Sequence, residues 1–134
     1  MELTVKAHDK NLEAVTAFVH SQITDKYSDD TEHKIDLAVE EIFVNIAHYA
    51  YGAENTDNES KILCTYEKGL LSVTFIDSGK PFNPLNNPDP DITLSAEERK
   101  IGGLGIYLTK KFMDETFYEY TDGKNILTIK KKIV

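Results

Sequence analysis

The sequence predicts an α+β fold, a two-layer sandwich in which helices cover one face of a mixed, mostly antiparallel sheet. Two amphipathic segments come early in the chain, and a third follows a long loop. Two pairs of strand-like segments meet at Lys68-Gly69 and Asp122-Gly123, which are turn sequences typical of hairpins. A chain of 134 residues is long enough to bury one core. We therefore expect a single domain over residues 1–134.

The first half of the chain predicts one strand followed by two helices. Apolar and polar residues alternate over residues 3–7, which is typical of a strand. Apolar side chains at helical spacing predict a helix over residues 11–26. A second helix follows residues 29–31, whose side chains suit a helix N-cap, and it ends near Gly52, which suits a C-cap.

The second half predicts two hairpins separated by a long loop and a third helix. Residues 61–66 and 70–77 form the first hairpin. Residues 78–101 hold all four prolines and show no sustained period, and a loop of this length is usually functional or disordered. A helix is expected over residues 106–113, and a second hairpin finishes the chain over residues 116–133.

Charge and cysteine content restrict the possible partners. The net charge is -8 and the pI is about 4.9, which disfavours nucleic acid or an anionic membrane as a partner. Cys64 is the single cysteine, so no internal disulfide can form and a reducing compartment is favoured. No apolar run reaches membrane-spanning length, and the first five residues do not resemble a secretory signal. We therefore expect a cytoplasmic protein that binds neither nucleic acid nor a membrane.

A polar stripe runs along the edge of the second predicted helix, where Glu41, Asn45 and His48 recur at i, i+4 and i+7. The stripe borders an apolar face formed by Ile35, Ala38, Val39, Ile42, Ile46 and Tyr49. The Glu41 carboxylate could accept the proton of an attacking hydroxyl or water, and the Asn45 amide oxygen could complete a magnesium shell. The alternative is a plain Glu–Asn hydrogen bond at the helix edge, with His48 as a structural residue.

An acidic residue ends the strand over residues 70–77. Asp77 shares one strand face with Leu71, Val73 and Phe75, because strand side chains alternate. An inward carboxylate at a strand end can accept a hydrogen bond from the exocyclic amine of a purine. Gly79 follows, and a glycine lets the backbone approach a flat ligand. The alternative is an ordinary turn that ends the strand.

A glycine cluster, Gly102-Gly103-Leu104-Gly105, leads directly into the third predicted helix. Glycines leave backbone N–H groups free to point at an anion, and a helix N-terminus adds partial positive charge. The alternative is a hinge followed by a helix cap. The cluster is neither a P-loop, since Gly-Lys-Ser/Thr is missing, nor a dinucleotide fingerprint, since no strand precedes it.

The order and spacing of these three motifs resemble those of a known ATPase superfamily. The chain runs from Glu41-Ile42-Phe43-Val44-Asn45 through Asp77-Ser78-Gly79-Lys80-Pro81-Phe82 to the glycine cluster. This order resembles the ATPase fold shared by gyrase, heat-shock chaperones and histidine kinases. Within that superfamily, the small chain resembles the bacterial anti-sigma-factor serine kinases, over about residues 3–133.

The resemblance implies a role for each matching position. Glu41 would be the base toward a serine hydroxyl, and Asn45 would be the magnesium ligand. Asp77 would bind the adenine amine, with Gly79 making room for the ring. The phosphates would be contacted by Gly103, Leu104 and Gly105, and a hydroxyl beside adenine would come from Thr128. An ATP lid would lie within residues 78–101.

The function implied by the resemblance is that of an ATP- and magnesium-dependent protein serine kinase. Such a protein would phosphorylate or sequester a protein partner, namely a sigma factor or an antagonist-like regulator of one. The alternative is a nucleotide-gated protein-binding module with little catalysis, in which ATP orders the long loop and so sets partner affinity. The family commonly dimerises, which implies a possible homodimer. One position departs from the family pattern, since Tyr49 stands where a histidine is common.

Overall fold

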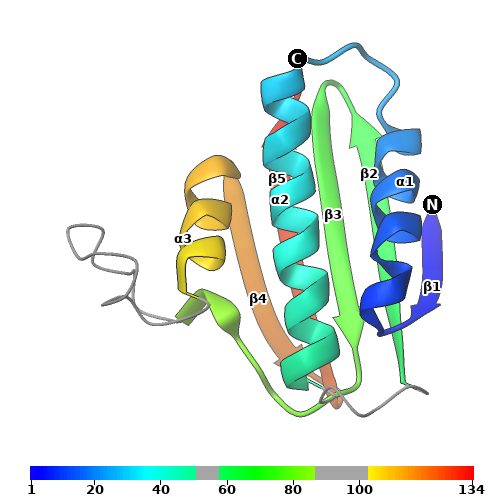
Figure 1. Cartoon of the computed structure of the whole chain (residues 1–134), viewed down its shortest axis with the longest axis vertical. Coiled ribbons are helices and arrows are strands. Elements are labelled where there is room, and N and C mark those ends of the chain that lie inside the picture. The colour runs from blue at the N-terminus through cyan, green and yellow to red at the C-terminus, as the bar shows by residue number, and fades with distance from the viewer. Residues whose placement is uncertain (51–57, 87–102) are drawn as a thin grey trace.

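The protein is described by a computed structural model that covers residues 1–50, 58–86 and 103–134. Within these residues, five strands form one sheet in the order β1–β2–β3–β5–β4 (Figure 1). Their bounds are β1 (Glu2–Lys6), β2 (Glu59–Glu67), β3 (Leu70–Asp77), β4 (Glu115–Thr121) and β5 (Lys124–Lys132). All four pairings between the described strands are antiparallel.

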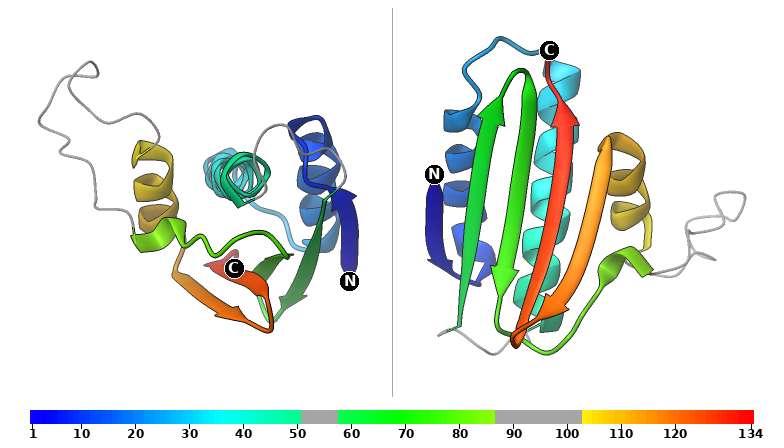
Figure 2. Two further views of the ribbon diagram at one scale, coloured as in Figure 1. Left: turned by 90° about the horizontal axis from the view of Figure 1, so that it is seen from below. Right: turned by 180° about the vertical axis from the view of Figure 1, so that it is seen from behind.

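The helices lie together on one face of the sheet, with α2 between α1 and α3 (Figures 1 and 2). The helices are α1 (Leu12–Gln22), α2 (Asp29–Asn45) and α3 (Gly103–Phe112). Shorter turns are η1 (Asp9–Asn11) and η3 (Pro84–Asn86), and a π-helix, η2 (Ile46–Ala50), continues α2. The predicted two-layer α+β sandwich is confirmed. None of the helices in the described ranges is long and apolar enough to cross a membrane.

The ends of the helices differ from the prediction for local reasons. Ser28 caps α2, because its side chain accepts a hydrogen bond from the Thr31 N–H at 3.1 Å. The cap therefore lies one residue before the predicted segment, and the acidic residues of that segment occupy the first turn, where they favour the helix dipole. α1 ends at Gln22 rather than near residue 26, because Ile23 has an extended backbone. α3 begins inside the glycine cluster, at Gly103.

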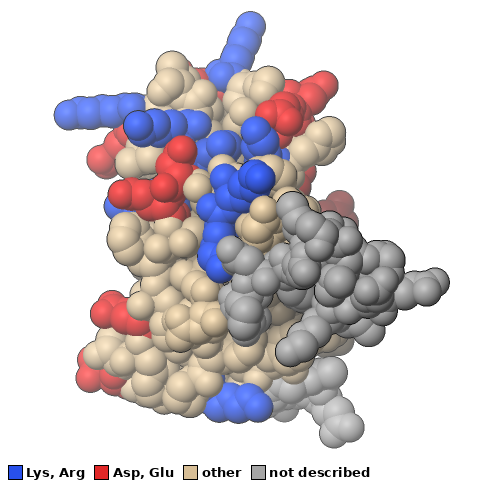
Figure 3. Space-filling model, turned by 90° about the vertical axis from the view of Figure 1, so that its left-hand side faces the viewer, with Lys and Arg blue, Asp and Glu red and all other residues tan. Residues whose placement is uncertain are grey.

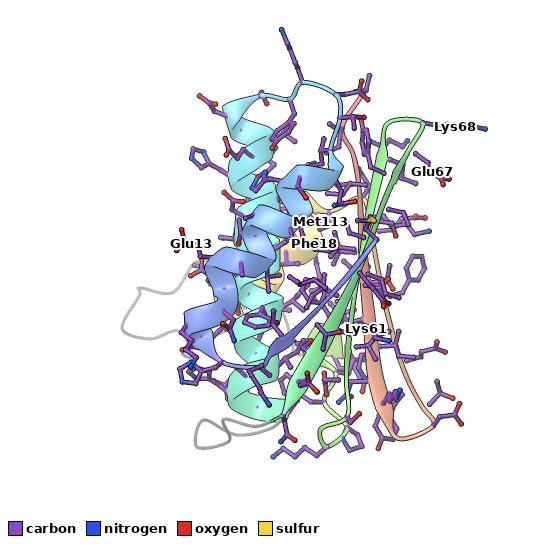
Figure 4. All side chains as sticks on the ribbon, turned by 90° about the vertical axis from the view of Figure 1, so that its right-hand side faces the viewer. Glu13, Phe18, Lys61, Glu67, Lys68 and Met113 are labelled. Carbon is purple, nitrogen blue, oxygen red and sulfur yellow. The ribbon has the colours of Figure 1, made fainter. Side chains whose placement is uncertain are left out.

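The core lies between the helix layer and the sheet. From β3 it takes the alternate residues predicted to face inward, and from α2 it takes Ile35, Ala38, Val39 and Ile42. Phe43 is also fully buried, although it lies off the predicted apolar face, because α2 has a helix on either side. Figure 4 views the two layers edge-on, with Phe18 and Met113 between them and Lys68 at the turn between β2 and β3.

The single cysteine belongs to this core. Cys64 lies in β2, between β1 and β3 in the sheet, and is 1% exposed. Burial raises the pKa of its thiol to about 11.

The last turn of α2 widens into a π-helix, and this change turns one predicted core residue outward. Tyr49 is 53% exposed, so its predicted place on the apolar face is wrong. A π-turn takes more residues than an α-turn, and the extra residue shifts the face that follows it. Ala50 is buried instead, and its carbonyl oxygen accepts a hydrogen bond from the Lys80 N–H at 3.1 Å. The π-turn thus joins the end of α2 to the segment that follows β3.

Candidate functional site

The first and third motifs meet where α2 lies beside the start of α3 (Figure 1). A methyl group added to Gly105 would lie 2.2 Å from both Cδ and Oε2 of Glu41. The Glu41 carboxyl therefore rests directly on the first turn of α3, in the space that the missing Gly105 side chain leaves. Two residues that are 64 positions apart in the chain, Glu41 and Gly105, thus lie in contact.

Glu41 is a half-buried carboxyl that accepts one weak hydrogen bond from the residues that the structure describes. The Asn45 Nδ2 donates to its Oε1 at 3.4 Å, which is the hydrogen bond expected from the simple pair at a helix edge. Burial raises the pKa of Glu41, the Asn45 hydrogen bond lowers it, and the nearby Glu40 raises it. A carboxylate of raised pKa accepts a proton more readily at neutral pH. Contact with Gly105 is what distinguishes Glu41 from an ordinary surface acid.

Asp77 ends β3 as an inward acid, as the alternation predicted. It is 4% exposed, and its Oδ1 accepts hydrogen bonds from the Gly79 N–H and from Asn125 Nδ2, each at 2.9 Å. The first bond closes the turn that was the alternative interpretation, and it does so on an acid that also faces inward. Burial raises the pKa of Asp77, and the bonds from Asn125 and Gly79 oppose that rise.

Asn125 is a residue of the site that the sequence analysis missed. Its side chain is 3% exposed and makes four hydrogen bonds. Nδ2 donates to Asp77 Oδ1 at 2.9 Å and to the Lys80 carbonyl oxygen at 2.8 Å. Oδ1 accepts from the Phe82 N–H at 3.0 Å and from the Tyr118 hydroxyl. The signal in the sequence was its position in phase with the apolar residues of the last strand.

The structure places Thr128 on the opposite face of the sheet from Asp77, whereas the resemblance implied that its hydroxyl would lie beside adenine. Asn125 is the residue paired with Asp77 across β3 and β5, and Thr128 follows three positions later. An odd number of residues moves a strand side chain to the opposite face. Thr128 accordingly pairs with Thr74 on the face away from the helices, with 3.0 Å between the two Oγ1 atoms.

Gly79 allows the segment after β3 to pass close to the end of α2. A methyl group added to Gly79 would lie 2.4 Å from the carbonyl oxygen of Ala50 and 2.9 Å from its Cβ. No side chain fits in that space, so a glycine is required where the segment crosses the π-turn. The neighbour that the structure shows at Gly79 is thus the backbone of Ala50.

A small cavity lies beside Asp77, at the end of the sheet that is lowest in Figure 1. Its lining comes from α2, β3, the segment after β3, β4 and β5, and includes Asn45, Ile46, Asp77, Phe82, Tyr118 and Asn125. Its volume is about 20 Å³, which is room for one water molecule. Phe82 also stacks on Tyr49, with 5.5 Å between the ring centroids. Asn45 touches both this cavity and Glu41, and so links the first two motifs.

The start of α3 presents backbone N–H groups beside Glu41. Gly103 is its first residue, and Leu104 is 38% exposed. Lysines gather at the other end of α3, which is roughly 15 Å away for a ten-residue helix. Figure 3 shows basic side chains over the upper part of this face. An anion at the Gly103 end would therefore be held by the helix N-terminus rather than by these lysines.

The predicted ATP lid is described only as far as residue 86. Gly102 and residues 87–101 lie outside the described residues. His48, assigned to a structural role, has its Nε2 2.8 Å from Asp9 Oδ2 and joins the end of α2 to η1.

A second group of titratable side chains lies between α1 and α2. The ligand atoms of His20, Glu32 and Asp36 lie within 4.8 Å of one another. His20 Nε2 is 2.6 Å from Asp36 Oδ1, and its Nδ1 is 2.5 Å from the Tyr27 hydroxyl. Both ring nitrogens of His20 are thus used in bonds between α1, α2 and the segment that joins them. We assign the group to helix packing.

Relatives of known name resemble this chain over most of its length. The serine-protein kinase RsbW of Bacillus licheniformis is 27% identical over 106 residues, which is 75% of this chain and 65% of that protein. The serine/threonine-protein kinase BtrW of Bordetella bronchiseptica is 25% identical over 131 residues, which is 96% of this chain and 89% of that protein. The chain thus spans slightly less than two thirds of the first relative and most of the second.

The fold and the family agree with the predicted resemblance. The solved structure of the RsbU and RsbW domains of Rv1364c from Mycobacterium tuberculosis superposes with a TM-score of 0.61 at 12% identity, over 99% of this chain and 32% of that one. This likeness shows a shared fold. The model of the histidine kinase-like ATPase domain, a family whose name implies ATP binding, matches residues 5–131. The chain therefore belongs to the histidine kinase-like ATPase domain family.

Proposed function

We propose that this protein is a magnesium- and ATP-dependent protein serine kinase that acts on a regulatory protein partner. The observation that carries the proposal is the contact of the Glu41 carboxyl with Gly105 at the N-terminus of α3. That contact puts a proton acceptor beside a helix end suited to phosphates. Two relatives named serine-protein kinase and serine/threonine-protein kinase support the same reaction.

Each described side chain suits one part of a bound magnesium nucleotide. Asp77 would accept a hydrogen bond from the adenine amine at the cavity. Asn45 donates its Nδ2 to Glu41, which leaves its amide oxygen for a magnesium ion. The backbone of Gly103, Leu104 and Gly105 would face the phosphates. Residues 78–86 would begin the ATP lid, since Phe82 from this segment lines the cavity.

Glu41 would act as the general base of the transfer. Its carboxylate would take the proton of a serine hydroxyl while the serine oxygen forms a bond to the γ-phosphorus. The bond between that phosphorus and the bridging oxygen to the β-phosphate breaks at the same time, and ADP leaves. Positioning and electrostatic stabilisation supply most of the rate in such transfers.

The test is phosphate transfer from ATP to the proteins encoded next to this chain, with Glu41→Gln as the variant. We expect Glu41→Gln to bind Mg-ATP as the natural chain does and to transfer phosphate at least 100-fold more slowly. Transfer at the natural rate by this variant contradicts the role of Glu41. Absence of both heat and thermal shift on titrating the natural chain with Mg-ATP contradicts nucleotide binding itself.

A second candidate function is a nucleotide-gated binding module with little catalysis. The observation that favours it is the small cavity, which is lined by Phe82 from the segment after β3 and is too small for a purine. A nucleotide must move the segment after β3 to enter, and this movement would change the surface offered to a partner. Equal partner affinity with and without Mg-ATP contradicts this function.

The identity of the partner and the oligomeric state are finer parts of the same proposal. The resemblance supports a sigma factor or an antagonist-like regulator as the partner, and a homodimer as the assembly. The buried, reduced thiol of Cys64 is consistent with work in the cytoplasm. Sedimentation equilibrium with and without Mg-ATP tests the dimer.

A further inference from the structure

The Asn125 side chain is a fully used, buried amide at the centre of the cavity wall. Its two N–H donors go to Asp77 Oδ1 and the Lys80 carbonyl oxygen, at 2.9 and 2.8 Å. Its oxygen accepts from the Phe82 N–H and the Tyr118 hydroxyl. A buried amide with every bond made is held in one orientation, because turning it would break all four bonds.

This orientation decides which oxygen of Asp77 is left for a ligand. The Gly79 N–H and the Asn125 amide both donate to Oδ1. Among the residues that the structure describes, both of these bonds end on Oδ1, which leaves Oδ2 for a donor in the cavity that Asp77 lines. An ionised carboxylate only accepts hydrogen bonds, whereas a protonated one also donates. The protonation state of Asp77 thus sets the kind of base edge that the cavity can accept.

We propose that Asn125 is a positioning residue that makes the cavity selective for a purine with an exocyclic amine, because it holds Asp77 as a pure hydrogen-bond acceptor. This inference rests on the proposed function, since it assumes that a nucleotide base enters at Asp77. Adenine presents an amine at its position 6, whereas hypoxanthine presents a carbonyl oxygen there. A carboxylate accepts a bond from the amine and repels the carbonyl oxygen.

The electrostatics of the cavity make the donor from Asn125 necessary. Burial raises the pKa of Asp77, and the hydrogen bond from Asn125 is the first of two contacts that lower it again. Without that donor, Asp77 would hold its proton to a higher pH and would present a hydroxyl to the base. Tyr118 from β4 is the other titratable side chain in the described lining, and burial raises its pKa above 10, so it stays neutral near pH 7.

Asn125 also fixes the segment after β3, and a purely structural role must be separated from a selective one. Asn125→Asp serves this purpose, because the new side chain has the same shape and keeps an oxygen for Phe82 and Tyr118. It loses the donor to Asp77 and sets two carboxyls beside each other, which then share one proton at neutral pH. Asn125→Thr keeps a hydroxyl donor and is the conservative variant. Thr128→Val is the matched control on the other face of the same strand.

The experiment is titration calorimetry with Mg-ATP and with the magnesium complex of inosine triphosphate, from pH 6 to pH 8. We expect the natural chain and Thr128→Val to bind ATP at least tenfold more tightly than inosine triphosphate throughout this range. In Asn125→Asp the ratio falls at least tenfold, and ATP affinity becomes dependent on pH. Asn125→Thr recovers part of the ratio. If Asn125 only packs the segment after β3, its loss would weaken the binding of both nucleotides equally and leave the pH dependence of binding unchanged.

The outcomes separate this inference from the function on which it rests. If the natural chain binds ATP and Asn125→Asp keeps its selectivity and pH profile, the inference is overturned and the proposed function stands. If Asn125→Asp does not fold, equal selectivity in Asn125→Thr and Asn125→Ala overturns it. If the natural chain binds neither nucleotide, the proposed function is overturned, and the inference with it.

Discussion

The Glu41 carboxyl touches Gly105 on one side and Asn45 on the other, so its position depends on a glycine in another helix. Gly105→Ala would put a methyl group 2.2 Å from the end of the Glu41 side chain, which is flexible and can turn aside. We expect a small loss of stability and at least a tenfold slower transfer of phosphate, because misplacement by about 1 Å can cost about 100-fold in rate. Transfer assays and urea unfolding measure the two effects. If Gly105→Ala transfers phosphate at the natural rate while Glu41 is still required for transfer, this account is contradicted.

Asp77→Asn separates the hydrogen bonds that hold the pocket together from the binding of the nucleotide base. The new side chain keeps an oxygen for the Gly79 and Asn125 donors, and it presents an amide donor where Oδ2 faced the cavity. A donor cannot pair with an exocyclic amine, so we expect Mg-ATP affinity to fall at least tenfold. Isothermal titration measures the loss. Unchanged affinity would mean that Asp77 does not contact the base.

The raised pKa of Asp77 predicts how the stability of the natural chain changes with pH, and Asp77→Asn provides the comparison. Burial raises that pKa in the folded state, so the folded chain holds the proton more tightly than the unfolded chain. The free energy of unfolding of the natural chain therefore falls as pH rises from about 4, the unfolded pKa, through the folded pKa. Urea unfolding should show Asp77→Asn gaining stability relative to the natural chain from pH 4 to pH 7. A constant difference would contradict the raised pKa.

The site residues whose positions the sequence predicted correctly are those whose position follows from local spacing. Glu41 and Asn45 share a helix edge, and Asp77 is in phase with the apolar residues of its strand. Asn125 was missed and Thr128 was misplaced for one reason. The last strand has apolar and polar residues on both faces, so its pattern alone does not say which face meets Asp77, and that choice is made by pairing with β3.

At the scale of elements, the site depends on the contact between the π-turn after α2 and the segment after β3. Gly79→Ala would bring a methyl group within 2.4 Å of a backbone oxygen of Ala50, which cannot turn aside as a side chain can. We expect a loss of about 1–3 kcal/mol in the free energy of unfolding, as is usual for overpacking. Urea midpoints measure the loss, and Gly105→Ala is the matched control because its neighbour is a flexible side chain. An equal effect of the two substitutions would contradict this distinction.

The helices and strands themselves were predicted with errors confined to their ends. Alternation and helical spacing indicate an element and its buried face, but an end depends on single hydrogen bonds such as that from Thr31 to Ser28. The π-turn could not be predicted, because a helical projection assumes a constant 100° per residue. That assumption placed Tyr49 in the core, whereas the wider turn exposes it beside Phe82.

At the scale of the whole molecule, the site forms where the chain gathers one end of α2, β3 and β5 together with the start of α3 (Figure 1). Local patterns predicted each motif but not the distances between motifs, which come from the packing of the helix layer on the sheet. The resemblance to a known superfamily supplied that arrangement, and the contact of Glu41 with Gly105 confirms that two of the motifs meet.

A ligand held between these elements should stabilise all of them together. At a free Mg-ATP concentration of about 100 times Kd, binding adds about 2.7 kcal/mol to the free energy of unfolding. We expect a rise of several degrees in Tm for a domain of this size, and a clearly smaller rise in Asp77→Asn at the same concentration, because its affinity is at least tenfold lower. Differential scanning fluorimetry with and without magnesium measures both. An equal shift in the two proteins would indicate binding elsewhere.

The buried thiol of Cys64 in β2 can report the opening of the sheet, because a reagent reaches it only in opened molecules. Cys64 has a pKa of about 11, so roughly one thiol in a thousand is ionised at pH 8 even before access is considered. A maleimide or aromatic disulfide reagent should therefore react only in molecules whose sheet has come apart. In the regime where closing is faster than labelling, the rate follows the population of open molecules, and saturating nucleotide at about 100 times Kd should slow it about 100-fold. The labelling rate of the one native cysteine thus measures ligand binding, with no engineered label in the molecule.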